Sequence, residues 1–241
     1  MNNVLSFIDE NGLFVEAHGG CFLLHNGTYY WYGEDRRGDA YVHCYSSKDL
    51  LNWEDKGSVI STSTFQEQKL EGYELGLVNE FGHKVNLERP KVVYNKLSKM
   101  FVMYMHYENG ENYDVAALAV AVSSCPDKDF VYLGHTRPLG NMSRDCTLFV
   151  DEDDKAYFIS ASNNNFDLHI YALSSDYLKV TSLVNKLFIG KSREAPALIK
   201  KDGVYYLFSS FCTGWMPNQC MQSVPSSGAG RRQGNPRFLH S

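Results

Sequence analysis

The sequence predicts an all-β chain assembled from repeated four-stranded units, and three observations favour this fold class. Aromatic residues make up 14% of the 241 residues, and such side chains fit the pleated surface of a β-sheet. One sequence pattern recurs four times along the chain, and a second pattern follows three of its copies. No stretch shows a sustained period of ~3.6 residues, which argues against a parallel α/β fold.

The first repeated pattern is an apolar stretch, a polar turn and then an aromatic-rich stretch. Each copy is typical of a β-hairpin, because its turn carries the Asn, Asp and Gly residues that hairpin loops favour. The four copies occupy residues 20–34, 90–107, 145–162 and 196–211.

The second pattern is an alternating strand that ends in Ser-Ser, followed by an Asp-containing turn and another short strand. Its copies occupy residues 41–53, 117–130 and 168–178. One hairpin of each kind makes a four-stranded unit of roughly 45–70 residues, and such units arranged radially form a β-propeller. The sequence therefore encodes about three and a half to four blades, whereas the smallest usual propeller has about four.

The end of the chain follows neither pattern. We expect residues 1–222 to form an incomplete propeller domain and residues 223–241 to form an irregular tail, because the tail is rich in Ser, Gly, Arg and Pro. The fourth unit would then stop after its first hairpin, with an unpaired edge at residues 205–211. We accordingly expect this chain on its own to be poorly soluble or weakly stable, with little activity.

Composition and charge narrow the choice of partners. The formal net charge is −5 at pH 7 without any long Lys/Arg cluster, which disfavours a nucleic-acid partner. Apolar runs are far shorter than the ~18 residues that a transmembrane helix needs. The first ten residues do not resemble a signal peptide, so we expect a cytoplasmic protein unless a leader was removed. We also expect a monomer.

The six cysteines show no spacing typical of a metal site. Most lie beside apolar residues, so we interpret them as buried free thiols. No metal and no cofactor is expected, and no ligand set for a structural cation can be specified.

One polar residue stands next to the first strand of each predicted unit: His18, Glu88, Asp145 and Glu194. The innermost strands of a propeller line its channel, so equivalent residues of separate repeats are expected to meet at one mouth. Each residue alone could be a turn residue or a salt-bridge partner. Carboxylates that lie close together, however, push their pKa values apart and so separate acid from base roles. Two carboxyl groups around a glycosidic bond are what sugar hydrolysis requires.

Aromatic side chains could complete a sugar site by stacking on the rings of the substrate. The candidates follow or end the first hairpins, and core packing is the alternative for about half of them. They are Trp31, Tyr32, Tyr107 and Trp215.

These motifs resemble those of glycoside hydrolase family 43, the five-bladed propeller enzymes, and more narrowly those of its exo-β-1,3-galactanase subgroup. The matching motifs span residues 12–219. They are Ala17–Gly20 with Tyr29–Glu34, Leu87–Lys91, Ser143–Phe149, Arg193–Pro196 with Tyr205–Leu207, and Thr213–Asn218.

The resemblance implies an inverting glycosidase that releases galactose from the non-reducing end of β-1,3-galactan. Glu194 falls on the position of the general acid, and Asp145 on that of the Asp that tunes its pKa. The position of the base falls on Ala17–His18, where this sequence has no Asp. The subgroup is expected to use a glutamine from a later blade to handle the water, and no matching segment is found here. Glu88 is then expected to contact substrate or water at the catalytic centre.

Further substrate-binding residues are implied by the same resemblance: His18, Gly19, Glu34, Tyr107, Arg144, Trp215 and Asn218. The partner would be an oligosaccharide or polysaccharide. Two alternatives stay open. One is an arabinofuranosidase or xylosidase of the same family, against which the missing Asp near His18 argues. The other is a sugar-binding propeller without catalytic activity, or an inactive fragment.

Overall fold

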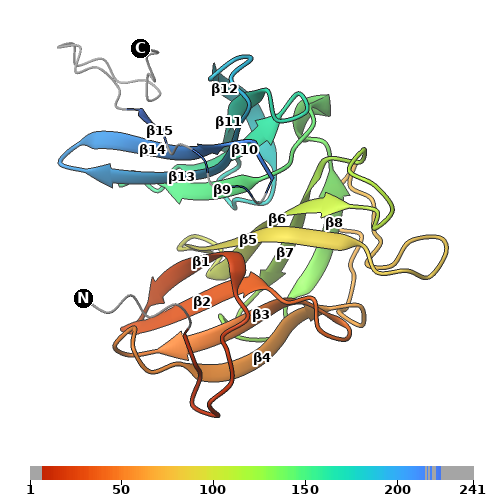
Figure 1. Cartoon of the computed structure of the whole chain (residues 1–241), viewed down its shortest axis with the longest axis vertical. Coiled ribbons are helices and arrows are strands. Elements are labelled where there is room, and N and C mark those ends of the chain that lie inside the picture. The colour runs from red at the N-terminus through yellow and green to blue at the C-terminus, as the bar shows by residue number, and fades with distance from the viewer. Residues whose placement is uncertain (1–6, 215, 217, 219–220, 224–241) are drawn as a thin grey trace. The chain divides into compact units, whose positions relative to one another are not determined.

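The computed structural model describes residues 7–214, 216, 218 and 221–223. In this part of the chain almost all regular structure is β-strand, arranged in four antiparallel sheets (Figure 1). The expected all-β fold of repeated sheets is therefore confirmed. The chain divides into two compact units, residues 1–136 and residues 137–241, each of which contains two sheets.

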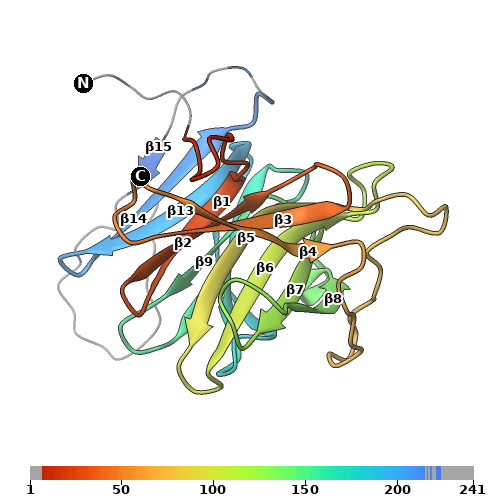
Figure 2. The same cartoon turned by 90° about the horizontal axis from the view of Figure 1, so that it is seen from below.

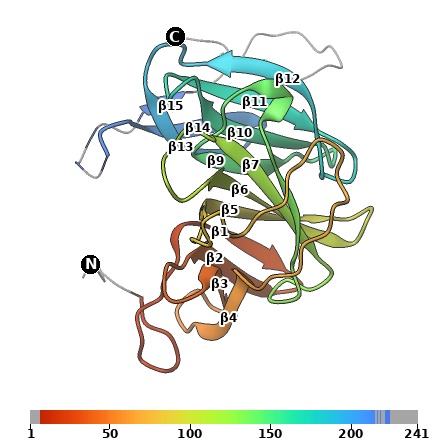
Figure 3. The same ribbon diagram turned by 90° about the vertical axis from the view of Figure 1, so that its right-hand side faces the viewer.

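The first unit consists of two four-stranded sheets whose strands are adjacent in sequence order (Figures 2 and 3). The first sheet contains β1 (His18–His25), β2 (Thr28–Glu34), β3 (Ala40–Ser47) and β4 (Glu54–Ser61). The second sheet contains β5 (Asn86–Asn95), β6 (Met100–Glu108), β7 (Ala117–Ser123) and β8 (Val131–Thr136).

The second unit has one four-stranded and one three-stranded sheet. The former contains β9 (Cys146–Val150), β10 (Ala156–Ser162), β11 (Asp167–Leu173) and β12 (Val180–Leu187), and a short 3₁₀ turn at Pro138–Gly140 precedes it. The latter contains β13 (Arg193–Lys201), β14 (Val204–Phe211) and β15 (Met221–Ser223).

Each unit is held together by apolar side chains between its two sheets. In the first unit, Tyr32, Met103 and Tyr132 are fully buried in a core to which both sheets contribute. In the second unit, Ile159 and Leu207 belong to a smaller core. Burial of such side chains is the main favourable term in folding, at about 1.5–3 kcal/mol for each large apolar side chain.

The same irregularity occurs near the start of β1, β5 and β13. The pairing register shifts just after His18, Glu88 and Glu194, and the next residue in each case has a positive φ. These next residues are Gly19 (60°), Arg89 (54°) and Ala195 (49°). A β-bulge of this kind bends its strand and redirects a side chain. His18, Glu88 and Glu194 thus stand at equivalent points of three blades, as predicted.

In each bulge, the residue that follows the one with positive φ is also suited to its position, and the reason differs between proline and glycine. Pro90 and Pro196 have no N–H that the ladder would leave unpaired. Gly20 lies against the neighbouring strand so closely that a Cβ would be 1.7 Å from the carbonyl oxygen of Tyr32. Only glycine fits at that point.

Asp145 reaches the corresponding place in the third blade without a bulge. It directly precedes β9, and its carbonyl oxygen accepts a hydrogen bond from the backbone N–H of Ala161 at 2.8 Å. The backbone N–H of Arg144 donates to the carbonyl of Ala161 at 2.9 Å, so the ladder continues past the strand end.

The edge of β14 and the cysteines differ in part from what the sequence predicts. The edge at residues 205–211 is not bare, because β15 pairs with Leu207–Ser209 of β14. Residue 223 is therefore the end of a strand, and the rest of the expected tail lies outside the described residues. The described cysteines Cys21, Cys44, Cys125, Cys146 and Cys212 are free, as predicted, but only Cys44 and Cys146 are buried, and the other three are partly exposed. Cys220 lies outside the described residues.

In the part of the chain that the structure describes, no helix is long and apolar enough to cross a membrane.

Candidate active site

Glu88 lies at the centre of a polar cluster in the first unit. Its Oε1 accepts hydrogen bonds from the Tyr113 hydroxyl at 2.6 Å and from Arg36 Nη2 at 3.0 Å. Its Oε2 lies 3.4 Å from Nδ1 of His106. Burial alone would raise the pKa of Glu88, but the contacts with His106, Tyr113 and Arg36 outweigh it and lower the pKa to about 2. Glu88 is therefore a carboxylate, and no proton donor, at neutral and mildly acidic pH.

His106 lies behind Glu88, on the neighbouring strand and opposite it in register. The imidazole is buried, and its Nε2 contacts Oε1 of Glu108 at 2.8 Å. Burial alone would lower the pKa of His106, but the contacts with Glu108 and Glu88 outweigh it and raise the pKa above 6.5. Both contacts thus favour the protonated form of the ring beside the Glu88 carboxylate.

Glu34, the last residue of β2, is buried and receives donors from several segments. Its Oε1 accepts a hydrogen bond from the backbone N–H of Arg89 at 3.0 Å and lies 3.3 Å from Nδ1 of His18. Its Oε2 accepts a hydrogen bond from Arg36 Nη2 at 3.2 Å. Because Arg36 also contacts Glu88, its guanidinium bridges two carboxylates of separate blades.

Gly19 provides the room that this cluster needs. A Cβ at that position would lie 2.8 Å from Oε1 of Glu34 and 2.9 Å from Cδ of Arg89. Together with its positive φ, this crowding disfavours every side chain at residue 19. The structure thus brings His18, Gly19, Glu34 and Glu88 together, as the sequence predicts for the first two blades.

The second unit brings Asp145 and Glu194 next to each other. Oδ2 of Asp145 accepts a hydrogen bond from the backbone N–H of Ala195, the residue after Glu194, at 3.1 Å. Cys212 lies beside both, and burial and its hydrogen bond with Glu194 raise the pKa of its thiol. Asn165 Nδ2 donates to the same sulfur at 3.5 Å.

Arg144, an expected binding residue, and Arg193, which precedes Glu194, have different surroundings. Arg144 is partly exposed, next to Asp145 in the sequence, and its Nη2 donates to Oδ1 of Asn164 at 3.3 Å. Arg193 is buried, and its Nε donates to the hydroxyl of Ser209 at 3.1 Å. Arg193 therefore braces the hairpin that carries Glu194.

Three expected sugar-binding residues do not fit that role or cannot be placed. Tyr107 is in the core, 5% exposed and stacked on His135 with 3.6 Å between ring centres. The amide of Asn218 is occupied within its own loop, because it donates to the carbonyl of Phe211 at 2.6 Å and to the hydroxyl of Thr213 at 2.7 Å. Trp215 lies outside the described residues.

The sequence reasoning missed several residues of the clusters: Arg36, His106, Glu108, Tyr113 and Asn165. The pairing register would have found one of them. His106 is the register partner of Glu88, just as Glu34 is the partner of His18.

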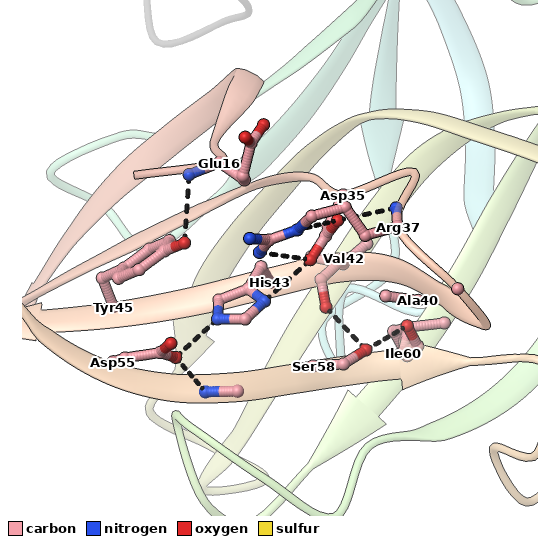
Figure 4. A network of polar contacts seen from close by, with 12 residues as sticks. Glu16, Asp35, Arg37, Ala40, Val42, His43, Tyr45, Asp55, Ser58 and Ile60 are labelled. Atoms are coloured by element: carbon pink, nitrogen blue, oxygen red, sulfur yellow. Dashed lines mark hydrogen bonds and ion pairs between the residues drawn. The ribbon is translucent and has the colours of Figure 1, made fainter. Parts of the chain in front are cut away.

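A second polar network in the first unit is structural (Figure 4). His43 contacts Oδ2 of Asp35 at 2.9 Å through Nδ1 and Oδ1 of Asp55 at 2.5 Å through Nε2. Arg37 donates to both oxygens of Asp35, at 2.9 and 2.8 Å. Burial would raise the pKa of Asp35, but its hydrogen bonds with Arg37 and His43 lower it below 3.8. Asp35 and His43 are buried, and their polar contacts join the loop after β2 to β3 and β4.

Among the described residues, no three His, Cys, Asp or Glu side chains are grouped so that they could hold a metal ion.

Comparison with known proteins gives a consistent picture. The family model of the glycosyl hydrolases family 43 matches residues 19–232. An exo-β-1,3-galactanase from Clostridium thermocellum is 47% identical, with a TM-score of 0.81, over 91% of this chain and 48% of that chain. An exo-β-1,3-galactanase from Phanerochaete chrysosporium, solved with β-1,3-galactotriose, is 33% identical, with a TM-score of 0.80, over 94% of this chain and 51% of that chain.

A family 43 β-1,3-galactosidase, solved with galactodeoxynojirimycin, is 34% identical, with a TM-score of 0.79. The match covers 92% of this chain and 76% of that chain. The present chain thus spans about half the length of the two galactanases. A search of curated protein sequences gave no significant match. These similarities confirm the propeller-type fold that the repeats predict.

Proposed function

Because the chain belongs to glycosyl hydrolase family 43, we propose that it acts as an inverting glycosidase that releases galactose from the non-reducing end of β-1,3-galactan. Support for the substrate comes from the neighbours, which are named as β-1,3-galactanases and a β-1,3-galactosidase. The galactotriose complex was obtained with a variant in which one glutamate is replaced by glutamine.

The contact between Asp145 and the backbone of Ala195 carries the assignment of roles. In our proposal Glu194 is the general acid that protonates the leaving oxygen, while water attacks the opposite face of the sugar. Asp145 fixes the backbone immediately after Glu194 through the 3.1 Å hydrogen bond. Such a restraint favours catalysis, because small errors in the position of an acid cost rate.

Glu88 and Glu34 serve a different purpose in this proposal. The low pKa of Glu88 excludes it as an acid, and carboxylates are good acceptors for the hydroxyl groups of a sugar. We assign Glu88 to the sugar or the attacking water, and Glu34, His18, Gly19 and Arg144 to binding of the substrate. Both compact units belong to one catalytic domain in this view, since the family match runs through both.

The first product of β-1,3-galactotriose hydrolysis tests the proposal, because the galactose released first comes from the non-reducing end alone. Proton NMR during the first minutes of the reaction should show α-galactose, because a single displacement inverts the β-linkage. Chromogenic arabinofuranoside and xyloside substrates are the matched comparison and should be hydrolysed far more slowly. Initial β-galactose, or a preference for the arabinofuranoside, would contradict the proposal. Binding of galactan without any product would support a sugar-binding function instead.

A further inference from the structure

Behind Glu88, the first unit contains a buried row of titratable side chains that the general-acid mechanism does not use. It runs from Glu88 through His106 to Glu108, which is fully buried. The two contacts are 3.4 Å between Oε2 of Glu88 and Nδ1 of His106, and 2.8 Å between Nε2 of His106 and Oε1 of Glu108. Buried charges are costly unless they are paired, so this row needs an explanation.

The hydrogen-bond chemistry indicates which groups carry charge. Oε2 of Glu108 accepts a hydrogen bond from the backbone N–H of Ala116 at 2.9 Å, and Oε1 of Glu88 accepts from Tyr113 and Arg36. Both carboxyl groups are therefore surrounded by donors, as carboxylates are. A neutral imidazole has only one N–H, so it could donate to only one of its two neighbours. Nδ1 is buried without a hydrogen bond and faces Oε2 of Glu88 at 3.4 Å, so a proton on this nitrogen as well as on Nε2 would place positive charge between the two carboxyl groups.

We propose that His106 is a positioning residue. Glu108 holds its ring as a doubly protonated imidazolium, and this ring orients the Glu88 carboxylate and keeps it charged. The proposal rests on the function assigned above. It ascribes to Glu108 the role of the anchor, because that side chain is fixed by the backbone of Ala116. Tyr113 and Arg36 are the other polar groups on Glu88, and Tyr113 also lies beside the His106 ring, with 5.9 Å between ring centres.

The consequence is a dependence of catalysis on pH that a merely structural histidine would not produce. If a neutral side chain replaces the cation, the pKa of Glu88 should return from about 2 towards its ordinary value of 4.5. An opposite charge at this distance typically shifts a carboxyl group by about 1–3 pKa units. Glu88 would then become protonated, and activity would fall, in a pH range where the wild-type enzyme still works.

The first experiment measures kcat/KM on β-1,3-galactobiose for wild type, His106→Gln and Glu108→Gln. The pH runs from about 3.5 to about 8, so that it includes the ordinary pKa of a glutamate. The acidic limb should move by about one pH unit or more to higher pH in His106→Gln, and in the same direction in Glu108→Gln. His135→Gln is the matched control. His135 is also mostly buried in this unit, but its pKa is lowered by burial to about 4, so it is neutral. That variant should lose stability and keep the wild-type limb.

The second experiment does not depend on activity, and its main measurement is made on the wild type. Nitrogen NMR of protein labelled at histidine should show both ring nitrogens of His106 protonated at pH 7.5. In Glu108→Gln, the His106 ring should lose its second proton at a lower pH than in the wild type. A singly protonated ring in the wild type, facing a protonated Glu108, would overturn the proposal. So would an unchanged acidic limb in His106→Gln. An inactive wild type on every galactoside would refute the proposed function and leave the NMR result as the test of the row.

Discussion

Asp145 and Ala195 are joined by a hydrogen bond of 3.1 Å, in which the carboxylate of the third blade accepts the backbone N–H just after Glu194. The contact spans two sheets of the second unit, and it restrains the bulge from which the Glu194 side chain projects. Each of the two carboxylates therefore has a separate, testable role.

Replacing Asp145 by Asn should reduce activity without unfolding the protein. An amide can present either its oxygen or its NH₂ group to the N–H of Ala195, and the charge is lost in both cases. We expect kcat on β-1,3-galactobiose to fall at least ~10-fold, since charge-assisted hydrogen bonds are about twice as strong as neutral ones. Steady-state kinetics and thermal unfolding on the same samples check this. An Asp145→Asn enzyme with wild-type kcat would show that the contact is only architectural.

Replacing Glu194 by Gln should abolish most turnover while binding persists. The amide keeps the shape of the side chain but cannot donate the acidic proton, and general acid catalysis contributes ~10²–10⁴-fold. Calorimetric titration with β-1,3-galactobiose should still detect the ligand. Glu152→Gln, at an exposed carboxylate in the 151–155 turn, is the control and should behave as wild type. Near-normal turnover in Glu194→Gln would refute its assignment as the acid.

The Asp35 network should contribute stability that depends on pH. The pKa of Asp35 in the folded state lies below 3.8, so its stabilisation is complete above that value and is lost as the pH falls through the lowered pKa. Asp35→Asn should cost about 2 kcal/mol at pH 7, because the charge-assisted hydrogen bonds from the half-exposed Arg37 guanidinium and the contact with His43 lose their anion. Urea unfolding at pH 7 and pH 3 checks this, and the difference from wild type should shrink at pH 3.

Asp39→Asn is the control for that comparison, since Asp39 is exposed in the same loop. Its stability should stay within about 0.5 kcal/mol of wild type. A deficit of Asp35→Asn that stayed constant with pH would mean that packing, and not the charge, explains it.

Replacing Gly20 by Ala should be strongly destabilising. The new Cβ would lie 1.7 Å from the carbonyl oxygen of Tyr32, so two backbone strands would have to separate. We expect a loss of about 3 kcal/mol or failure to fold. Gly27→Ala in the same hairpin meets no atom within 4 Å and should cost only about 1 kcal/mol through its positive φ. Equal losses in the two variants would show that the close approach is easily relieved.

Local patterns are sufficient to predict the hairpins and the first residues of the blades. Turns such as Asn26-Gly27 and Asp202-Gly203 carry their own conformational preference, so the hairpins around them can be recognised from the sequence. The carboxylates Glu88, Asp145 and Glu194 could be aligned because each stands beside the start of such a hairpin.

The contacts of His106, Arg36 and β15 could not be predicted from local sequence patterns. Almost every residue of β6 is buried, so alternation does not reveal that His106 faces Glu88 while Tyr107 packs in the core. Arg36 comes from a loop whose contact with Glu88 is a tertiary one, at a separation of 52 residues. β15 has three residues only, too few to show an alternating pattern.

The repeated bulges have a consequence for self-association. β1, β5 and β13 are each an edge strand of their sheet, and an edge strand with a regular row of unpaired backbone groups can recruit a foreign strand. The register shift after His18, Glu88 and Glu194 interrupts the regular row of backbone groups near the start of each strand. Pro90 and Pro196 also lack the backbone N–H that could donate there. The local kink that aims the polar side chains therefore also makes these strands poor templates for an incoming β-strand.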